Sequence, residues 1–271
     1  MSLHKKLFFF FSFCLTVAFS SCNHGPYALT NKSYKKQAKQ LAKTIQQAPL
    51  KDSVNTGTWV GTTNFNLRKP NFVIIHHTAQ NSCAQTLNTF TMQRTQVSAH
   101  YVICKDGTIH HMLNDYMRAW HAGISRWGND ADINSSSIGI ELDNNGFEPF
   151  TDLQMNSLLT LLAALKKQYN IPTANFIGHA DVAPTRKNDP NIFFPWKALA
   201  DSGFGYWYED TTNIILPQSF NDLLALRIIG YDIRDTTAAI IAFKRHWLQD
   251  TIPVFDSAQY KVLFNVMKKY E

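Results

Sequence analysis

The stretch Gly-His-Ala-Asp-Val-Ala-Pro-Thr-Arg-Lys-Asn-Asp-Pro, residues 178–190, decides the fold and the chemistry of this chain. The short apolar run at residues 175–178 leads into it and is typical of the end of a buried strand. We expect that strand to deliver His179 to the rim of a sheet, where a loop takes over. Ten residues later the loop offers Asp189, with Lys187 two positions before it. An imidazole and a carboxylate on one rim are two of the three protein ligands that a catalytic zinc needs.

A second apolar run, residues 72–75, is followed directly by His76 and His77 and supplies the third ligand. Four consecutive apolar residues indicate a strand that is covered on both faces. Neighbours on a strand point to opposite faces, so only one of the two histidines can serve, and position alone does not choose between them. Three protein ligands leave a fourth position for water, whose pKa zinc lowers toward neutrality. The pattern therefore predicts a hydrolase.

Two further charged residues suit this chemistry. Glu141 closes the run at residues 137–140, where an unpaired carboxylate is costly, so we interpret it as the group that orients the water and carries its proton. A structural ion pair is the alternative. Lys187 would stabilise the oxyanion of a tetrahedral intermediate, with a solvated loop lysine as its alternative. Each ligand histidine, taken alone, could also be a buried imidazole satisfied by backbone groups.

Strands and helices follow one another in an order that predicts an α/β fold, a central mixed sheet flanked by helices. The expected strands are residues 72–75, 99–104, 108–112, 137–142 and 175–178, and the expected helices are residues 34–47, 83–94 and 151–169. Lys-Asp-Gly at residues 105–107 indicates a hairpin, and Thr151 is placed to cap the last of these helices. Residues 120–134 are rich in Gly, Trp and Asn and predict a long loop, which in a compact domain is usually functional.

The first 22 residues have the composition of an export signal. Lys5 and Lys6 precede an apolar run at residues 7–19, which is too short for a membrane-spanning helix, and two serines lead to Cys22. A cysteine directly after small residues resembles a bacterial lipoprotein box, in which Cys22 is lipidated; a cleaved secretory signal is the alternative. We therefore expect an exported lipoprotein of the bacterial cell envelope, anchored to a membrane (the outer membrane, on its periplasmic side) through Cys22.

Composition excludes some function classes. Of 271 residues 45% are hydrophobic, which predicts a real core, and the formal charge is +6, to which the signal contributes two lysines. No basic block with interleaved aromatics is present, so nucleic acid is not expected as a partner, whereas a mildly basic surface suits an anionic cell wall. Cys83 and Cys104 lie outside the signal. In an exported protein they could pair, but the sequence leaves the pairing open, and neither has metal-ligand spacing.

The C-terminal part predicts a small helical domain. Its expected helices are residues 220–229, 236–249 and 257–270, separated by Gly230 and Pro253. We therefore divide the chain into a signal (residues 1–22), a catalytic domain with an N-terminal helix (23–200), a linker (201–216) and a three-helix domain (217–271).

Five motifs in order resemble the type-2 N-acetylmuramoyl-L-alanine amidases, whose fold is shared by peptidoglycan recognition proteins and phage amidase-type lysozymes. The motifs are His-His-Thr-Ala at 76–79, Val-Ser-Ala-His-Tyr at 97–101, Ala-Trp-His-Ala-Gly at 119–123, Ser-Ile-Gly-Ile-Glu at 137–141, and the stretch at 178–190. The resemblance covers residues 71–196. It implies hydrolysis of the amide bond between the lactyl group of N-acetylmuramic acid and the L-alanine of the peptidoglycan stem peptide.

The resemblance also implies a role for each matching residue. The zinc ligands implied are His76, His179 and Asp189, which selects His76 over His77. The resemblance implies that Glu141 is the proton shuttle and that Lys187 stabilises the oxyanion. It also implies that the substrate groove is lined by His100, Trp120 and His121. One departure is Asn191, where the family usually has a glycine; it affects a turn rather than a ligand.

The C-terminal helices resemble the three-helix peptidoglycan-binding domain that is often attached to wall hydrolases. A module that only braces the catalytic domain is the alternative. For the whole chain, two other functions remain open. One is a non-catalytic peptidoglycan receptor on the same fold, which would lack a metal ligand. The other is a recycling amidase for anhydro-muropeptides, against which the export signal argues.

Overall fold

The computed structural model describes residues 25–46, 62–64, 66–67 and 69–271, so the signal and Cys22 lie outside the described residues. The chain forms two compact units, residues 1–63 and 64–271. The described helix of the first unit, α1 (Ala28–Ile45), begins at Ala28 rather than at Tyr34, and no side chain in it is buried. Within the described ranges, no helix has the length and apolar character needed to cross a membrane.

The second unit is built on a five-stranded sheet with the order β3-β2-β4-β1-β5. The central strand β1 (Phe72–His77) pairs in parallel with β4 (Ser137–Leu142) and with β5 (Phe176–Gly178). On the other side, β2 (Tyr101–Ile103) runs parallel to β4 and forms the predicted hairpin with β3 (Ile109–His111), its antiparallel neighbour. The prediction of a mixed sheet is confirmed.

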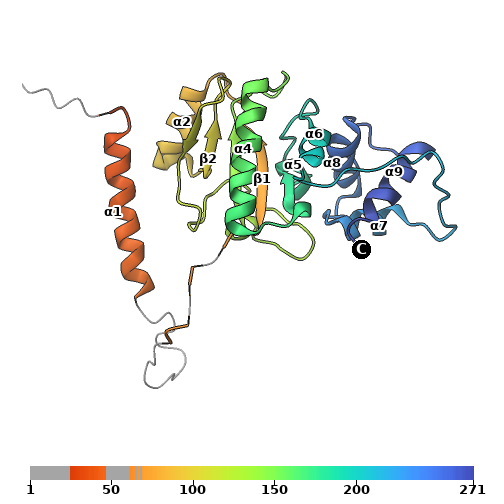
Figure 1. Cartoon of the computed structure of the whole chain (residues 1–271), viewed down its shortest axis with the longest axis horizontal. Helices are drawn as coiled ribbons and strands as arrows, with labels where there is room; N and C mark the ends of the chain where they lie inside the picture. The colour runs from red at the N-terminus through yellow and green to blue at the C-terminus, as the bar shows by residue number, and fades with distance from the viewer. Residues whose placement is uncertain (1–24, 47–61, 65, 68) are drawn as a thin grey trace, which may run out of the picture. The chain divides into compact units, whose positions relative to one another are not determined.

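Helices connect and cover the strands (Figure 1). The connecting helices are α2 (Cys83–Thr91), α3 (Ile133–Ser136), α4 (Asp152–Tyr169), α5 (His179–Val182) and α6 (Trp196–Asp201), with 3-10 turns η1 (Gln93–Thr95) and η2 (Thr173–Asn175). The chain then ends in α7 (Asp222–Ile229), α8 (Thr236–Leu248) and α9 (Ser257–Met267). The Thr151 cap is present, because its hydroxyl accepts from the Gln154 amide and the Gln154 side chain accepts from the Thr151 amide. Three helices were not expected: α3 begins within the loop predicted at residues 120–134, α5 continues from β5 in place of a loop, and α6 ends where the predicted linker begins.

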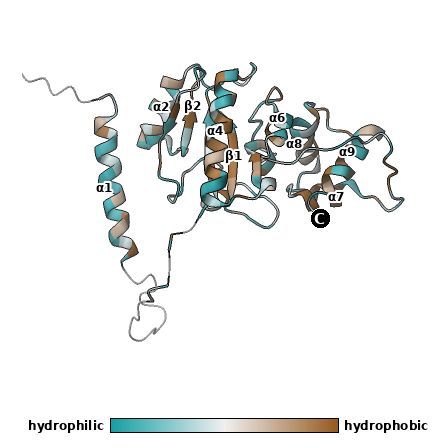
Figure 2. Cartoon of the chain, in the orientation of Figure 1, coloured by the Kyte–Doolittle hydropathy of each residue, from teal (hydrophilic) through white to brown (hydrophobic). Residues whose placement is uncertain are grey.

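The two faces of the sheet belong to two different hydrophobic clusters. Alternate residues of a strand point to opposite faces, and in β1 Val73 and Ile75 pack with α4, whereas Ile74 packs with the C-terminal helices. In the hydropathy colouring β1 is largely brown, whereas α4 alternates between brown and teal, as a helix with one apolar face does (Figure 2). By the same alternation His76 shares the face of Ile74. The candidate site therefore lies on the face that the C-terminal helices cover.

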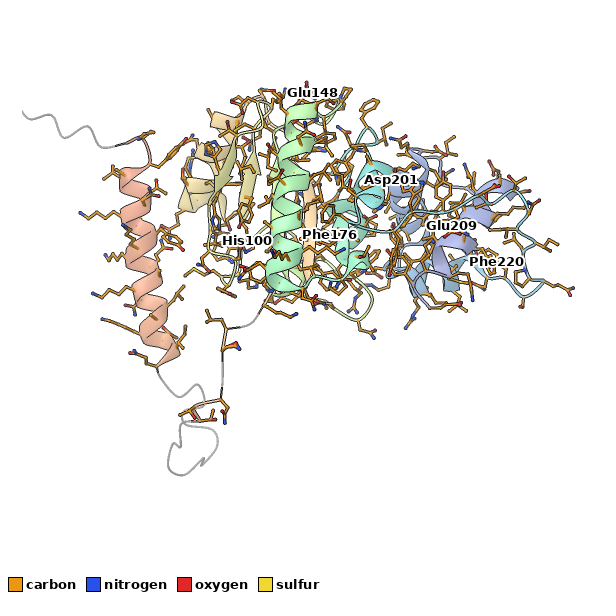
Figure 3. The ribbon with its side chains drawn as sticks, in the orientation of Figure 1. His100, Glu148, Phe176, Asp201, Glu209 and Phe220 are labelled. Atoms are coloured by element: carbon orange, nitrogen blue, oxygen red, sulfur yellow. A yellow bond between two sulfur atoms is a disulfide. The ribbon has the colours of Figure 1, made fainter. Side chains whose placement is uncertain are left out.

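The three C-terminal helices belong to the same compact unit as the sheet. Phe243 and Trp247 of α8 share one hydrophobic cluster with Ile74 and Ile177 of the sheet. Polar contacts add to this packing, because Asp181 of α5 pairs with His246 of α8 at 2.7 Å and both are buried. Side chains fill the region between the sheet and these helices (Figure 3). The apolar stripes of the predicted helices are thus buried against the sheet as well as against one another.

Cys83, the first residue of α2, and Cys104, which directly follows β2, form a disulfide. The sequence left this pairing open, and the structure settles it. The bond ties the helix that follows the His76 strand to the hairpin.

If the C-terminal helices share a core with the sheet, Phe243→Ala should destabilise the whole unit. Phe243 is fully buried in α8, and a Phe→Ala change in a core costs about 3–5 kcal/mol. We expect one cooperative urea transition, shifted to lower denaturant by both tryptophan fluorescence and far-ultraviolet circular dichroism. Leu224→Ala, at an exposed position of α7, is the control and should change stability by less than about 0.5 kcal/mol. A separate early transition for the C-terminal helices, with the main one unmoved, would contradict a shared core.

Candidate metal centre

His76 and Glu141 are neighbours because of strand register. The parallel pairing of β1 with β4 places His76 opposite Glu141, near the carboxyl ends of both strands. Paired residues of adjacent strands point to the same face, so both side chains enter the same site. His77 occupies the opposite face, where its ring lies against Gly146. The choice of His76 over His77, left open by position alone, follows from this geometry.

His179 and Asp189 reach the site from the two ends of one loop. His179 is the first residue of α5, directly after β5. The chain then turns outward and returns, and the amide of Ala180 donates to the carbonyl of Asp189 at 2.7 Å. This single backbone bond brings the ends of the loop together.

The three predicted ligand atoms form a tight triangle. His76 Nδ1 lies 2.9 Å from His179 Nδ1 and 3.1 Å from Asp189 Oδ2, and His179 Nδ1 lies 3.0 Å from Asp189 Oδ2. In a tetrahedral zinc site with bonds of about 2.0–2.1 Å, ligand atoms are about 3.3 Å apart, close to the separations found here. The three residues are at most 6% exposed. The structure therefore brings together the residues that the sequence predicted for the metal.

The protonation of these groups favours a cation at the centre of the triangle. His179 Nε2 lies 3.2 Å from the carbonyl oxygen of Ala122, which can only accept a hydrogen bond, so the ring carries its proton on Nε2 and presents a lone pair at Nδ1. That lone pair faces the carboxylate of Asp189, which is also an acceptor. Two acceptors at this distance need a proton or a cation between them. The donor set of two imidazole nitrogens and a carboxylate is one that zinc uses in catalytic sites.

Burial keeps the imidazole neutral and the carboxylate ionised, as a metal requires. Burial, with the nearby His179, lowers the pKa of His76 to about 4. For Asp189, burial acts to raise the pKa, but charge and hydrogen bonds from His179 and His76 outweigh it and hold the pKa well below its usual value. At neutral pH both groups are therefore in the form that binds a cation.

Glu141 is buried beside the triangle. Its Oε1 lies 4.0 Å from His76 Nδ1, and no described residue hydrogen-bonds its Oε2 atom. Burial, reinforced by the charge of Asp189, raises the pKa of Glu141 to about 8, although Lys187 opposes the shift. The alternative role for Glu141, a structural ion pair, does not fit, because the nearest basic side chain is His76, whose lowered pKa keeps it neutral at neutral pH. A buried carboxyl group with a spare oxygen is equipped to hold and release a proton.

A cavity of about 320 Å³ opens over the triangle. Trp120 and His121 line it from one side, and the exposed Lys187 lines it from the loop that ends at Asp189. His100 does not line it: its ring is fully buried, accepts from the amide of Gly139 and lies 3.0 Å from the carbonyl of Met117. The structure thus places Trp120 and His121 in the lining of the cavity and His100 in a buried position behind it.

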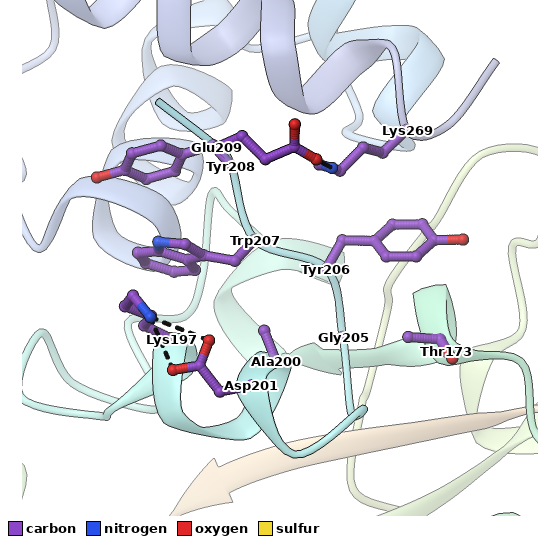
Figure 4. A pocket seen from close by; sticks show the side chains of 10 residues that line it. All are labelled: Thr173, Lys197, Ala200, Asp201, Gly205, Tyr206, Trp207, Tyr208, Glu209 and Lys269. Carbon is purple, nitrogen blue, oxygen red and sulfur yellow. Dashed lines mark hydrogen bonds and ion pairs between the residues drawn. The ribbon is translucent and has the colours of Figure 1, made fainter. Parts of the chain in front are cut away.

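A second cavity of about 360 Å³ lies between α6 and the segment at residues 205–209 (Figure 4). Three aromatic residues line it, but its charged groups are already paired, Lys197 with Asp201 and Glu209 with Lys269. Neither a histidine nor an unpaired carboxylate lines this cavity, so its lining lacks the groups for acid–base or metal chemistry. The cavity over the triangle is the candidate site.

The sequence analysis did not identify two polar residues, Asn134 and Ser137, that contact His121 and its loop next to the metal ligands. Asn134 accepts from two backbone amides of the loop that carries His121, and Ser137 contacts the His121 ring. A signal for Ser137 existed, because Ser137, Gly139 and Glu141 alternate with three apolar residues in β4 and mark one polar face. No comparable pattern marks Asn134, whose role depends on a loop distant in sequence.

Comparison with known proteins gives the same answer as the geometry. Residues 66–192 match the family described as N-acetylmuramoyl-L-alanine amidase. The chain is 33% identical over 206 residues to the N-acetylmuramoyl-L-alanine amidase AmiD of Escherichia coli, covering 65% of this chain and 74% of that protein. It is 40% identical over 108 residues to the 1,6-anhydro-N-acetylmuramyl-L-alanine amidase AmpD of Haemophilus influenzae, covering 40% of this chain and 59% of that protein.

Solved structures agree. The structure of AmiD from Escherichia coli in complex with anhydro-N-acetylmuramic acid-L-Ala-D-gamma-Glu-L-Lys superposes with a TM-score of 0.68 at 28% identity, covering 78% of this chain and 93% of that one. AmpDh3 from Pseudomonas aeruginosa, in complex with an anhydromuramic pentapeptide, gives a TM-score of 0.67 at 27% identity over 80% of this chain and 98% of that one. The resemblance drawn from the five motifs is confirmed, and the chain belongs to the N-acetylmuramoyl-L-alanine amidase family.

Proposed function

We propose that this chain is a zinc-dependent peptidoglycan hydrolase that cleaves the amide bond between N-acetylmuramic acid and the L-alanine of the stem peptide. The observation that carries the proposal is the triangle of His76, His179 and Asp189, with ligand atoms 2.9–3.1 Å apart, beside a buried carboxyl group. A non-catalytic receptor on the same fold would not need both. Membership of the amidase family supports the same reaction.

His76, His179 and Asp189 would hold the zinc. Zinc, when bound, supplies a Lewis acid for the scissile carbonyl and makes a nucleophilic water available at neutral pH. A cation held by the three ligands would offset the charge of Asp189 and favour the ionised form of Glu141. The Glu141 carboxylate then takes the proton of the attacking water and returns it to the nitrogen of L-alanine as the amide bond breaks, so one carboxyl group acts first as base and then as acid. The Lys187 ammonium, in the rim of the same cavity, stabilises the negative charge that develops on the carbonyl oxygen.

The substrate class follows from the relatives. AmpD is named for 1,6-anhydro-N-acetylmuramyl-L-alanine, and both AmiD and AmpDh3 have been crystallised with anhydromuramic peptides. We propose that this chain accepts muropeptides with the same muramyl-L-alanine linkage. The alternative of an anhydro-muropeptide recycling amidase fits these relatives as well. Peptidoglycan and its fragments are the partners under either assignment.

For the location of the enzyme we propose a lipid anchor on Cys22, which places the amidase in the bacterial cell envelope, on the periplasmic face of the outer membrane. The support is the composition of residues 1–22, with two lysines, an apolar run and small residues before the cysteine. Such an anchor would hold the enzyme next to the cell wall.

Glu141→Gln should separate metal binding from turnover. We expect it to keep stoichiometric zinc, since Glu141 is not in the ligand triangle, and to lose at least 10²-fold of activity, the range for a missing proton-transfer group. His179→Ala should lose both zinc and activity. Zinc is measured by atomic absorption. Activity is measured by digesting purified sacculi and identifying the products by mass spectrometry, where amidase action releases peptides that begin with L-alanine. Near-normal turnover in Glu141→Gln would remove the proton shuttle from the mechanism.

The raised pKa of Glu141 predicts a pH-dependent stability when zinc is removed by a chelator. The folded carboxyl group, with a pKa of about 8, keeps a proton that the unfolded chain, with an ordinary value of about 4.5, has released. Stability contributed by this proton is complete below pH 4.5 and is lost as the pH rises toward 8. Urea unfolding of the chelated protein should show this decline above pH 6.5, where the lowered pKa of His76 no longer adds an opposite trend, and Glu141→Gln should flatten it. Equal slopes in the two proteins would show that Glu141 is ionised in the fold.

Cys22→Ser should release the protein from membranes in a Gram-negative host. Wild-type protein should partition into the detergent phase and yield an acylated N-terminal peptide, because two or more acyl chains anchor a protein stably. Cys14→Ser is the matched control, since Cys14 lies inside the predicted signal and would be removed with it. Equal membrane partitioning of Cys22→Ser and wild type would refute the anchor.

A further inference from the structure

One two-residue segment contacts both histidine ligands from behind. His76 Nε2 lies 3.0 Å from the Nδ1 atom of His121, and His179 Nε2 lies 3.2 Å from the carbonyl oxygen of Ala122. A metal-binding histidine almost always donates its second N–H to such a partner, which fixes the ring orientation and the tautomer. Here the two partners are adjacent residues, His121 and Ala122, so one piece of backbone serves both ligands.

Ser137 determines the tautomer of His76 through His121. The carbonyl of Ile133 can only accept, so the single hydroxyl proton of Ser137 is donated to it. The Ser137 oxygen then accepts from His121 Nε2, which lies 3.1 Å away. With its proton on Nε2, His121 presents a lone pair at Nδ1 and accepts from His76 Nε2. His76 is left with a lone pair at Nδ1, the atom that faces His179 and Asp189.

Asn134 fixes the position of the same segment. Its side-chain oxygen accepts from the amide of His121 at 3.0 Å and from the amide of Ala122 at 2.9 Å. Because both partners are donors, the oxygen rather than the nitrogen of the Asn134 side chain must face them. Asn134 is 6% exposed. A single buried oxygen therefore holds both groups that stand behind the histidine ligands.

Gly139 makes room for this arrangement. A Cβ atom at position 139 would lie 2.4 Å from Cγ of His121, so the ring packs directly on the β4 backbone. Asn134 lies in the short helix α3, and Ser137 follows that helix as the first residue of β4. Asn134 in α3 and Ser137 directly after α3 thus both reach the back of the metal site.

We propose that Asn134 and Ser137 are positioning residues that set the orientation and tautomers of His76 and His179 through the segment His121–Ala122. The inference rests on the proposed zinc site and deepens it. Neither residue touches a ligand atom or the substrate cavity. Their effect is carried by the hydrogen bonds that His76 and His179 donate away from the metal.

Zinc affinity tests Asn134. The zinc-loaded full-length protein is titrated with a chelator, and the dissociation constant is compared between variants. Asn134→Ala should weaken zinc binding 10–100-fold, the usual effect of losing a partner behind a ligand. Asn134→Asp keeps an acceptor oxygen for both amides and should restore affinity to within about threefold of wild type. Asn221→Ala is the matched control, since Asn221 also accepts from a backbone amide but caps α7; it should lower stability and leave zinc affinity unchanged.

Nitrogen NMR of the imidazole groups determines which ring nitrogen of each histidine carries the proton. In the zinc-loaded protein, His76, His121 and His179 should all carry the proton on Nε2. Ser137→Ala removes the acceptor of His121, so its Nε2–H should exchange faster with water, zinc should bind about 10-fold more weakly, and the His179 signal should stay unchanged.

Three results would overturn the inference. One is His121 protonated on Nδ1 in the wild-type protein. The second is an unchanged zinc dissociation constant in Asn134→Ala while the wild type binds zinc tightly, an outcome that leaves the proposed function intact. The third is wild-type protein that binds no stoichiometric zinc, which would remove the proposed function together with this inference.

Discussion

The parallel pairing of β1 with β4 and β5 is the constraint on which the site depends. It places His76 opposite Glu141 and Ile75 opposite Gly178, the residue directly before His179. A slip of one residue in β1 would turn His76 toward α4 and bring Val73 and Ile75 out of their apolar cluster. The hydrophobic contacts that hold the sheet therefore also hold the spacing of the ligands, and the chemistry follows from the register.

The site is electrostatically unfavourable on its own. With their protons on Nε2, two imidazoles present lone pairs toward a carboxylate oxygen, and a further carboxyl group lies 4.0 Å from one of them. All four are buried, so water does not weaken the repulsion, and the fold must supply the free energy that brings them together. A divalent cation converts this repulsion into attraction. Metal binding and fold stability are for that reason coupled, as in other proteins that bind a metal only when folded.

The sequence predicted the strands and the ligands because both depend on local patterns. An apolar run followed by histidine marks a strand end wherever it occurs, and the mixed sheet follows from the order of elements. Strand alternation alone did not choose between His76 and His77. The resemblance of the His-His-Thr-Ala motif selected His76, and the register of β1 with β4 gives the physical reason. The role of Asn134 could not be predicted either, because in the sequence Asn134 is one of several polar residues in an irregular loop. The two backbone amides that its side chain binds are more than ten positions away in the sequence. The disulfide between Cys83 and Cys104 also required the fold.

The C-terminal helices are part of the architecture of the metal centre, whatever else they bind. Asp181, in the helical turn that begins with His179, accepts from the Gly178 amide and the Tyr231 hydroxyl and pairs with His246. Detaching α8 would leave this buried carboxylate without its imidazole partner and would open the hydrophobic cluster beneath the site, at a cost of several kcal/mol. The helices therefore cannot leave the sheet to reach the wall. If they bind peptidoglycan, they must do so through their outer surface while the inner one stays packed, so bracing and binding are compatible roles of the same three helices.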